Sequence, residues 1–133
     1  MSRNDRTKAH SELVAAIRKE LGREKDLALY LNTKGRLKNV GGQSMYVTDP
    51  ALGVGTPDLV GILAVECRSF VMRDVITLGR WFCLEVKTGD AVLSQEQKLF
   101  RDMSRAKGCF FAEVRSVADA VAALQRARLG QYE

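Results

Sequence analysis

The sequence predicts an α/β fold of the α+β kind, in which helices flank one small mixed sheet. Three observations support this prediction: an amphipathic helix near the start, two apolar strands in the middle of the chain, and a helix–strand–helix unit at the end. The expected order of elements is αβββαβα. With 133 residues the chain is long enough for one hydrophobic core, so residues 1–133 are expected to form a single domain.

Amphipathic segments with recognisable caps are expected to be helices. In the first, Leu13, Ile17 and Leu21 recur at i, i+4 and i+8, which places them on one helical face. The second begins at Ser94, with Gln97 three residues later, and this is the pattern of a capping box. The three expected helices cover residues 8–21, 94–107 and 116–128.

Strands are expected where short apolar or alternating runs are bounded by turn residues. The run 27–31 is apolar, but its type is not assigned by its pattern. Residues 32–42 are polar and contain glycine, which indicates a loop or an irregular hairpin, and residues 66–79 are a candidate for an extra ribbon. The expected strands are residues 44–48, 59–65, 81–87 and 109–114.

Charged residues stand at the ends of the two central strands. In residues 81–87 the alternation of side chains places Glu85 and Lys87 on the face opposite the apolar residues, about 7 Å apart. Asp58 opens the preceding strand, residues 59–65. If these strands pair as an antiparallel hairpin, Asp58 meets Glu85 and Lys87 at one end of the sheet.

Two carboxylates and an ammonium group in this arrangement suit a magnesium-dependent phosphodiester hydrolase. Carboxylate oxygens hold a hard cation, and an ammonium group stabilises the negative charge that builds on phosphorus. The alternative is a solvated strand edge, with Asp58 in a turn and Glu85 and Lys87 as a surface ion pair. We favour the hydrolase because an apolar strand, a matching Asp and a Gly-Thr-Pro lead-in occur together.

The balance of charge is basic. Lysine and arginine number 21 against 16 acidic residues, a formal net charge of +5. This suits a nucleic acid, although it is also compatible with nothing more than solubility. Lys34, Arg36 and Lys38 alternate along the chain, so in an extended segment they would share a face and contact DNA phosphates. A solvated loop is an equally good reading of these three residues.

Histidine and cysteine content narrows the chemistry. His10 is the single histidine, which excludes catalytic mechanisms that need several histidines, such as those of histidine-rich metal nucleases. Cys67, Cys83 and Cys109 are odd in number and far apart, so neither a zinc site nor a disulfide framework is supported. Cys83 and Cys109 stand in apolar runs and are expected to be small buried residues.

Hydropathy gives no sign of a membrane partner. No apolar stretch approaches the ~20 residues of a membrane span. The polar residues 1–10 lack the apolar segment of a signal peptide. The expected location is therefore the cytoplasm or the nucleoid region of the host cell.

Taken together, the motifs resemble a stand-alone VRR-NUC domain of phage or bacterial type, a branch of the PD-(D/E)XK nuclease superfamily. The resemblance covers residues 11–121 and rests on Gly-Thr-Pro-Asp at 55–58, on Glu-Val-Lys-Thr at 85–88, and on Ser94 with Gln97. It implies a restriction-endonuclease-like core. The Val-Arg-Arg that names the family reads Val-Arg-Ser at 114–116 here, so no role is carried over to the third position.

The resemblance also implies a metal site for Mg²⁺ or Mn²⁺. Asp58 and Glu85 would be the metal ligands, with the backbone carbonyl of Val86 beside them. Glu12, in the first helix, would complete the water shell of the metal or bind it through hydrogen bonds.

Further roles follow from the same resemblance. Lys87 would orient or activate the attacking water and stabilise charge on the phosphoryl group. Gln97 would position Lys87 or the water. Arg115 would contact the DNA or a neighbouring strand.

The expected function is that of a divalent-metal-dependent, structure-specific DNA endonuclease. The first expectation is a homodimeric Holliday-junction resolvase, because a two-fold dimer is the economical way to cut a branched DNA twice. A less selective nuclease acting on flaps, nicks or duplex DNA is the alternative of the same class. Two non-enzymatic alternatives are a DNA-binding module that retains the fold and a basic scaffold protein.

Overall fold

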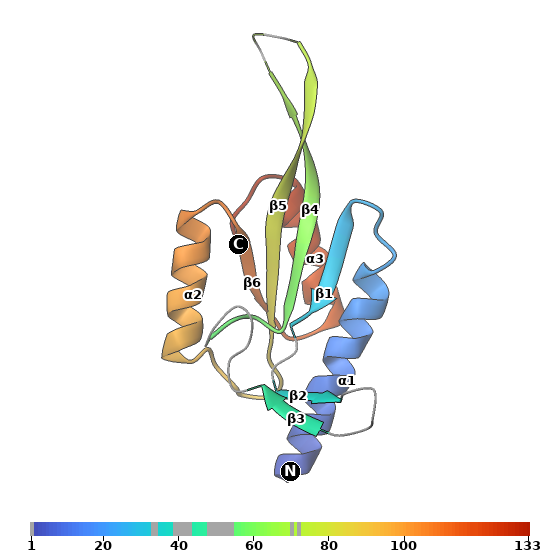
Figure 1. Ribbon diagram of the computed structural model, residues 1–133, viewed down its shortest axis with the longest axis vertical. Helices are drawn as coiled ribbons and strands as arrows, with labels where there is room; N and C mark the ends of the chain where they lie inside the picture. Colours follow the sequence, from blue (N-terminus) through green and yellow to red (C-terminus); the bar gives the residue numbers. More distant parts are fainter. Residues whose placement is uncertain (1, 33–34, 39–43, 48–54, 70, 72) are drawn as a thin grey trace.

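A four-stranded mixed sheet forms the centre of the computed structural model, which describes residues 2–32, 35–38, 44–47, 55–69, 71 and 73–133 (Figure 1). In the described residues the elements are α1 (Arg3–Leu21), β1 (Leu27–Leu31), β2 (Gly35–Lys38), β3 (Ser44–Val47), β4 (Leu59–Arg68), β5 (Val75–Val86), α2 (Gln95–Ala106), β6 (Phe110–Val114) and α3 (Val117–Arg128).

The central sheet has the strand order β1-β4-β5-β6. β4 pairs antiparallel with both β1 and β5, whereas β5 and β6 run parallel. β2 and β3 form a separate two-stranded hairpin. Figure 1 shows α3 behind the sheet and α2 beside β6, so helices lie on both faces of the sheet. The mixed α+β class expected from the sequence is confirmed.

The expected order αβββαβα was wrong in its strands. The segment 44–48 was expected to be one of the three strands before the second helix, but in the described residues β3 pairs with β2 in a separate two-stranded sheet. The unassigned run 27–31 instead supplies β1, which pairs with β4 at the edge of the four-stranded sheet. Leu27 is buried in the core and Leu29 packs against it, so alternate residues of β1 contribute to the sheet's inner face.

The main core lies between the sheet and the pair α1 and α3. On β5, Phe82 and Leu84 are fully buried there, as the alternation of residues 81–87 predicted. Phe82 stacks on Phe110 of the parallel strand β6 with ring centroids 5.3 Å apart. From α1 the core takes Val14 and Ile17, so these residues fix the rotation of the helix about its own axis.

A smaller core lies on the other face, under α2. Val60, Cys83 and Phe111 from three adjacent strands are buried in it with Leu93, and Phe100 of α2 packs against them. Burial raises the pKa of the Cys83 thiol to about 12. The expectation that Cys83 is a small buried residue is confirmed.

Caps explain where the helices begin. α1 starts earlier than residue 8, because Ser2 and Asp5 form a capping box. The expected capping box of α2 is present: the Ser94 hydroxyl accepts from the Gln97 backbone N–H, and the Gln97 side chain accepts from the Ser94 backbone N–H. Ser116 caps α3. No helix in the described part of the chain combines the length and apolarity needed to cross a membrane.

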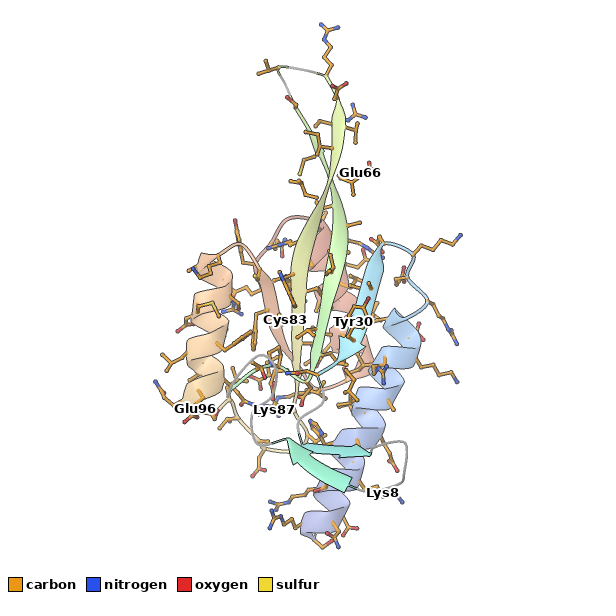
Figure 2. All side chains as sticks on the ribbon, in the orientation of Figure 1. Lys8, Tyr30, Glu66, Cys83, Lys87 and Glu96 are labelled. Atoms are coloured by element: carbon orange, nitrogen blue, oxygen red, sulfur yellow. The ribbon has the colours of Figure 1, made fainter. Side chains whose placement is uncertain are left out.

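β4 and β5 continue past the sheet as a twisted ribbon. Their pairing runs on from Val65 with Leu78 to Arg68 with Val75, so the extra ribbon expected in residues 66–79 is present. Figure 1 shows it projecting beyond the helices. In Figure 2, Glu66 marks this ribbon and Lys87 lies toward the opposite end of the sheet, where the candidate site is found.

Candidate functional site

The antiparallel register of β4 and β5 brings the two acidic residues to the same end of the sheet. Leu59 pairs with Leu84, so Asp58, one residue before Leu59, lies across from Glu85, one residue after Leu84. The carboxylate of Asp58 accepts a hydrogen bond from the backbone N–H of Val86 over 2.9 Å. The hairpin predicted from the sequence is therefore present, and it sets the two carboxylates on neighbouring strands.

A tight turn before β4 holds Asp58 in place. Gly55 has φ +80°, and a Cβ on it would lie 2.6 Å from the backbone of Glu96 at the start of α2, so only glycine fits. The side-chain amide of Asn32 donates to Thr56 Oγ1 over 2.8 Å and to the Pro57 carbonyl over 2.9 Å. The backbone N–H of Asn32 also donates to the Asp58 carbonyl. Asn32 thereby braces the turn against the end of β1, a role that only the structure shows.

Glu85, Lys87 and Gln97 form a polar network that is buried at Glu85 and partly buried at the other two residues. The side chain of Glu85 is 3% exposed and that of Lys87 13%, and Nζ of Lys87 is 3.3 Å from Oε1 of Glu85. Gln97 donates its amide to the same Oε1 over 2.7 Å and accepts from Lys87 Nζ over 2.9 Å. Because both charged groups are removed from solvent, they do not form the surface ion pair of the alternative reading.

His10 is the residue of α1 that reaches this end of the sheet. Its Nε2 lies 3.1 Å from the carbonyl oxygen of Val86 and 3.4 Å from Oδ2 of Asp58. Sequence analysis noted His10 only because it is the single histidine, and assigned it no place in the site. The one available signal was its spacing, since His10, Val14 and Ile17 recur at i, i+4 and i+7 and so share one helical face.

Glu12 does not join the site as the resemblance implied. It is exposed, and its carboxylate lies 3.9 Å from Nζ of Lys8 on the surface of α1. Two residues turn a helix by about 200°, so Glu12 and His10 lie on nearly opposite sides. With the α1 face of Val14 turned to the core, His10 points to the sheet end and Glu12 points away.

An open cleft of about 380 Å³ adjoins Asp58 and His10. Arg18, two helical turns after His10, also lines it and brings a cation to the cleft. The wall opposite the helix consists of Leu31 and Asn32 at the end of β1. The cleft therefore gives a substrate access to Asp58 beside the positive charge of Arg18.

The residues expected to bind DNA belong to different parts of the fold. Arg115 donates to the carbonyls of Gly89 and Ala91 and to the carboxylate of Glu113, so its guanidinium holds the loop after β5. Arg36 and Lys38 lie two residues apart on β2, and Lys34 lies outside the described residues.

We call the group of residues around Asp58 the strand-end cluster.

Comparison with protein-family models, curated proteins and solved structures finds no match to this chain. The chemistry of the site is therefore inferred from the cluster itself, which combines two carboxylates, a backbone carbonyl, an imidazole, an ammonium group and an amide. His10 and Asp58 are the members that line the cleft. The members are His10, Asp58, Glu85, Val86, Lys87 and Gln97.

The donor set of the cluster fits a small divalent cation. Asp58 and Glu85 offer carboxylate oxygens and Val86 offers a carbonyl oxygen, which are the ligand types of Mg²⁺ and Mn²⁺. Among the described residues no three His, Cys, Asp or Glu side chains form a group able to hold a metal ion. A two-carboxylate site is still sufficient for Mg²⁺, because that ion keeps several of its waters.

Proposed function

We propose that this protein is a divalent-metal-dependent DNA endonuclease of the PD-(D/E)XK type, as its resemblance to VRR-NUC domains implies. The observation that carries the proposal is the pair of buried Glu85 and partly buried Lys87, which Gln97 holds across from Asp58. Asp58 in turn lines the open cleft. The chemistry that this set suits is hydrolysis of a phosphodiester bond.

The free-energy cost of desolvating Glu85 and Lys87 suggests that this pair is kept for function rather than for stability. Removing a carboxylate and an ammonium group from water costs several kcal/mol per ion, and apolar residues of similar size often stabilise a fold as well or better. Leu84 and Val86 show that apolar side chains fill the neighbouring positions of β5. A costly pair beside Asp58 and an open cleft is typical of an active site.

Asp58, Glu85 and the Val86 carbonyl would hold Mg²⁺ or Mn²⁺, which when bound supplies charge neutralisation at the phosphoryl oxygens and a more acidic water. Lys87 would donate hydrogen bonds to a phosphoryl oxygen or to the attacking water. Gln97 fixes the ammonium group of Lys87 through its 2.9 Å hydrogen bond and thereby limits its rotation.

DNA is the substrate that the charge favours. The chain carries a net charge of +5, and Arg18 lines the cleft beside Asp58. Arg36 and Lys38, with Lys34 and Arg115, are the residues we propose to contact phosphates. A location in the cytoplasm or nucleoid region, where DNA is accessible, completes the proposal.

A branched DNA cut by a homodimer is the finer form of the proposal. One active site per chain makes one cut, whereas resolving a four-way junction takes two symmetric cuts, which a two-fold dimer provides. An apolar area supports self-association: Tyr30, Ile62 and Trp81, on adjacent strands of the sheet face that also carries Val60, are 59%, 48% and 47% exposed.

A single assay tests the function. Labelled four-way junction, flap, nicked and linear duplex DNA are incubated with the protein and Mg²⁺, Mn²⁺ or EDTA, and the cuts are mapped. Paired symmetric cuts on the junction, absent in EDTA, are expected for the resolvase. Equal cutting of linear duplex by a monomer would replace the resolvase with a less selective nuclease. No cutting of any substrate by a protein that still binds DNA would indicate a non-catalytic module.

A further inference from the structure

Charges on the helix α1 are segregated around its axis. Successive residues of an α-helix are about 100° apart, so Arg3, His10 and Arg18 fall within a sector of about 80°. The acidic residues of α1 all lie at least about 80° outside that sector. They are Asp5, Glu12 and Glu20. One side of α1 therefore carries cations without an acidic residue among them.

The two arginines on this side keep their charges available to a partner. On the rest of the helix surface, Lys8 lies 3.9 Å from Glu12, and Glu20 lies 3.8 Å from Arg23. Among the described residues no ion pair joins Arg3 or Arg18 to an acidic side chain, and both arginines are exposed. Exposed cations that no acid neutralises attract a polyanion.

The strand-end cluster lies between these two arginines. His10 contacts Asp58, with Nε2 3.4 Å from Oδ2. At a rise of about 1.5 Å per residue, Arg3 lies about 10 Å before His10 along the helix and Arg18 about 12 Å after it. Figure 1 shows α1 running beside β1, with its N-terminal end past the end of the sheet. Arg18 lines the same cleft as Asp58, so one cation lies on each side of the proposed reaction centre.

The inference rests on the proposed endonuclease function: we propose that α1 binds the backbone of the strand that is cut, with Arg3 on a phosphate to one side of the cut and Arg18 on a phosphate to the other. DNA carries one phosphate per about 3.4 Å along each strand, so spans of about 10 and 12 Å correspond to roughly three phosphates on each side. Phosphate contacts fix the register of a protein on DNA without reading bases. They would hold one phosphodiester bond at Asp58 whatever its sequence, as an enzyme that recognises branching requires.

The competing explanation is that both arginines are solvated charges, as Lys19 is. Lys19 follows Arg18 directly and is also exposed, but it lies about 180° from His10 around the helix, away from the cleft. A glutamine at either position removes one positive charge, so Lys19→Gln is the matched control for Arg18→Gln. Because all three positions are exposed, the variants are expected to melt like the wild type.

DNA binding without cleavage gives the first test. Fluorescence anisotropy measures the affinity for a four-way junction in EDTA between about 50 and 200 mM salt. Arg3→Gln and Arg18→Gln should each reduce the slope of log affinity against log salt by about 0.9, because each removes one phosphate contact. Lys19→Gln should leave the slope unchanged. A wild-type slope in either arginine variant, or an equal reduction in Lys19→Gln, overturns the inference.

Neutral phosphates locate each contact. The cut is mapped with the wild type and Mg²⁺ or Mn²⁺, and single methylphosphonate groups then replace the phosphates on either side of it. One replacement on each side should weaken binding by the wild type. Arg18→Gln should be insensitive to one of these replacements and Arg3→Gln to the one on the opposite side.

The outcomes separate the inference from the proposed function. Insensitivity of both variants on the same side of the cut overturns the inference and leaves the nuclease standing. A wild type whose binding depends on Arg3 and Arg18 but that cuts no DNA overturns the proposed function, and leaves α1 as a DNA-binding surface.

Discussion

Gln97 donates its side-chain amide to Oε1 of Glu85 over 2.7 Å, although the two residues belong to different elements. The carbonyl oxygen of the same side chain accepts from the Ser94 backbone N–H and from Nζ of Lys87, each over 2.9 Å. One side chain thus caps α2 and joins the two charges at the end of β5. The start of α2 is therefore fixed against the proposed catalytic group.

Asp58→Asn should abolish most of the cleavage without unfolding the protein. Asparagine keeps an oxygen that can accept the 2.9 Å hydrogen bond from Val86 N–H, but it lacks the negative charge that holds a hard cation. A single-turnover assay with junction DNA is expected to show a loss of about 10²-fold or more. Thermal melting should match the wild type, and near-normal cleavage would show that Asp58 is not a metal ligand.

Lys87→Ala should reduce the rate of cleavage about 10²-fold while metal binding persists. Lys87→Arg should restore little, because guanidinium is planar and longer than an ammonium group and presents its donors as a fixed fork. Both variants are measured by single-turnover kinetics and by Mn²⁺ titration. Full activity in the arginine variant would reduce Lys87 to a structural partner of Glu85.

Loss of Lys87 also leaves the buried Glu85 without its cation, which can cost about 3 kcal/mol of stability. The kinetic comparison is therefore made well below the melting temperature of the least stable variant.

Glu12→Ala should change cleavage and Mn²⁺ affinity less than about twofold, since it removes only the exposed pair with Lys8, worth about 0.3–0.5 kcal/mol. Single-turnover cleavage of junction DNA and Mn²⁺ titration measure both effects. A tenfold loss of cleavage or of Mn²⁺ affinity in Glu12→Ala would instead support the metal-site role that the family resemblance implied for Glu12.

Arg128→Met should lower stability at neutral pH, and the difference should vanish in acid. Arg128 donates to both carboxylate oxygens of Asp26, over 2.8 and 2.7 Å, and this hydrogen bonding lowers the pKa of Asp26 below its ordinary 3.8. The contribution is present above pH 3.8 and is lost as the pH falls through the lower folded-state value.

Urea unfolding at pH 7 and at pH 3 measures that effect. At pH 7 we expect a loss of about 1 kcal/mol or less, because Asp26 is partly exposed. A difference that is equal at both pH values would contradict the linkage to Asp26.

The three cysteines should react with a thiol reagent in order of exposure. Cys67 is exposed and Cys109 partly so, whereas Cys83 is buried with its pKa raised to about 12 by burial. At pH 8 the native protein should show one fast thiol, which Cys67→Ser removes, and a slower one. Cys83 should become reactive only in denaturant, and rapid modification of Cys83 in the native protein would contradict its place under α2.

Local pattern was enough to predict the hairpin at the site. Residues 81–87 alternate, the partner strand lies close in sequence, and an antiparallel connection places Asp58 beside Glu85 by register alone. The capping box at Ser94 and Gln97 followed from spacing in the same way. These features depend on neighbours in sequence or on a short connection, so periodicity determines them.

Tertiary packing decided the rest. The sequence pattern did not show that β1, rather than residues 44–48, pairs with β4. That choice depends on which segment can pack its apolar side chains into the distant core, as Leu27 and Leu29 do. The pattern also could not choose between His10 and Glu12, since a helix turns about 100° per residue and its rotation is set by the distant core. His10 and Val86 are 76 positions apart. The sequence determined which strand end bears the charges, and the packing of α1 determined which helical side chain meets them.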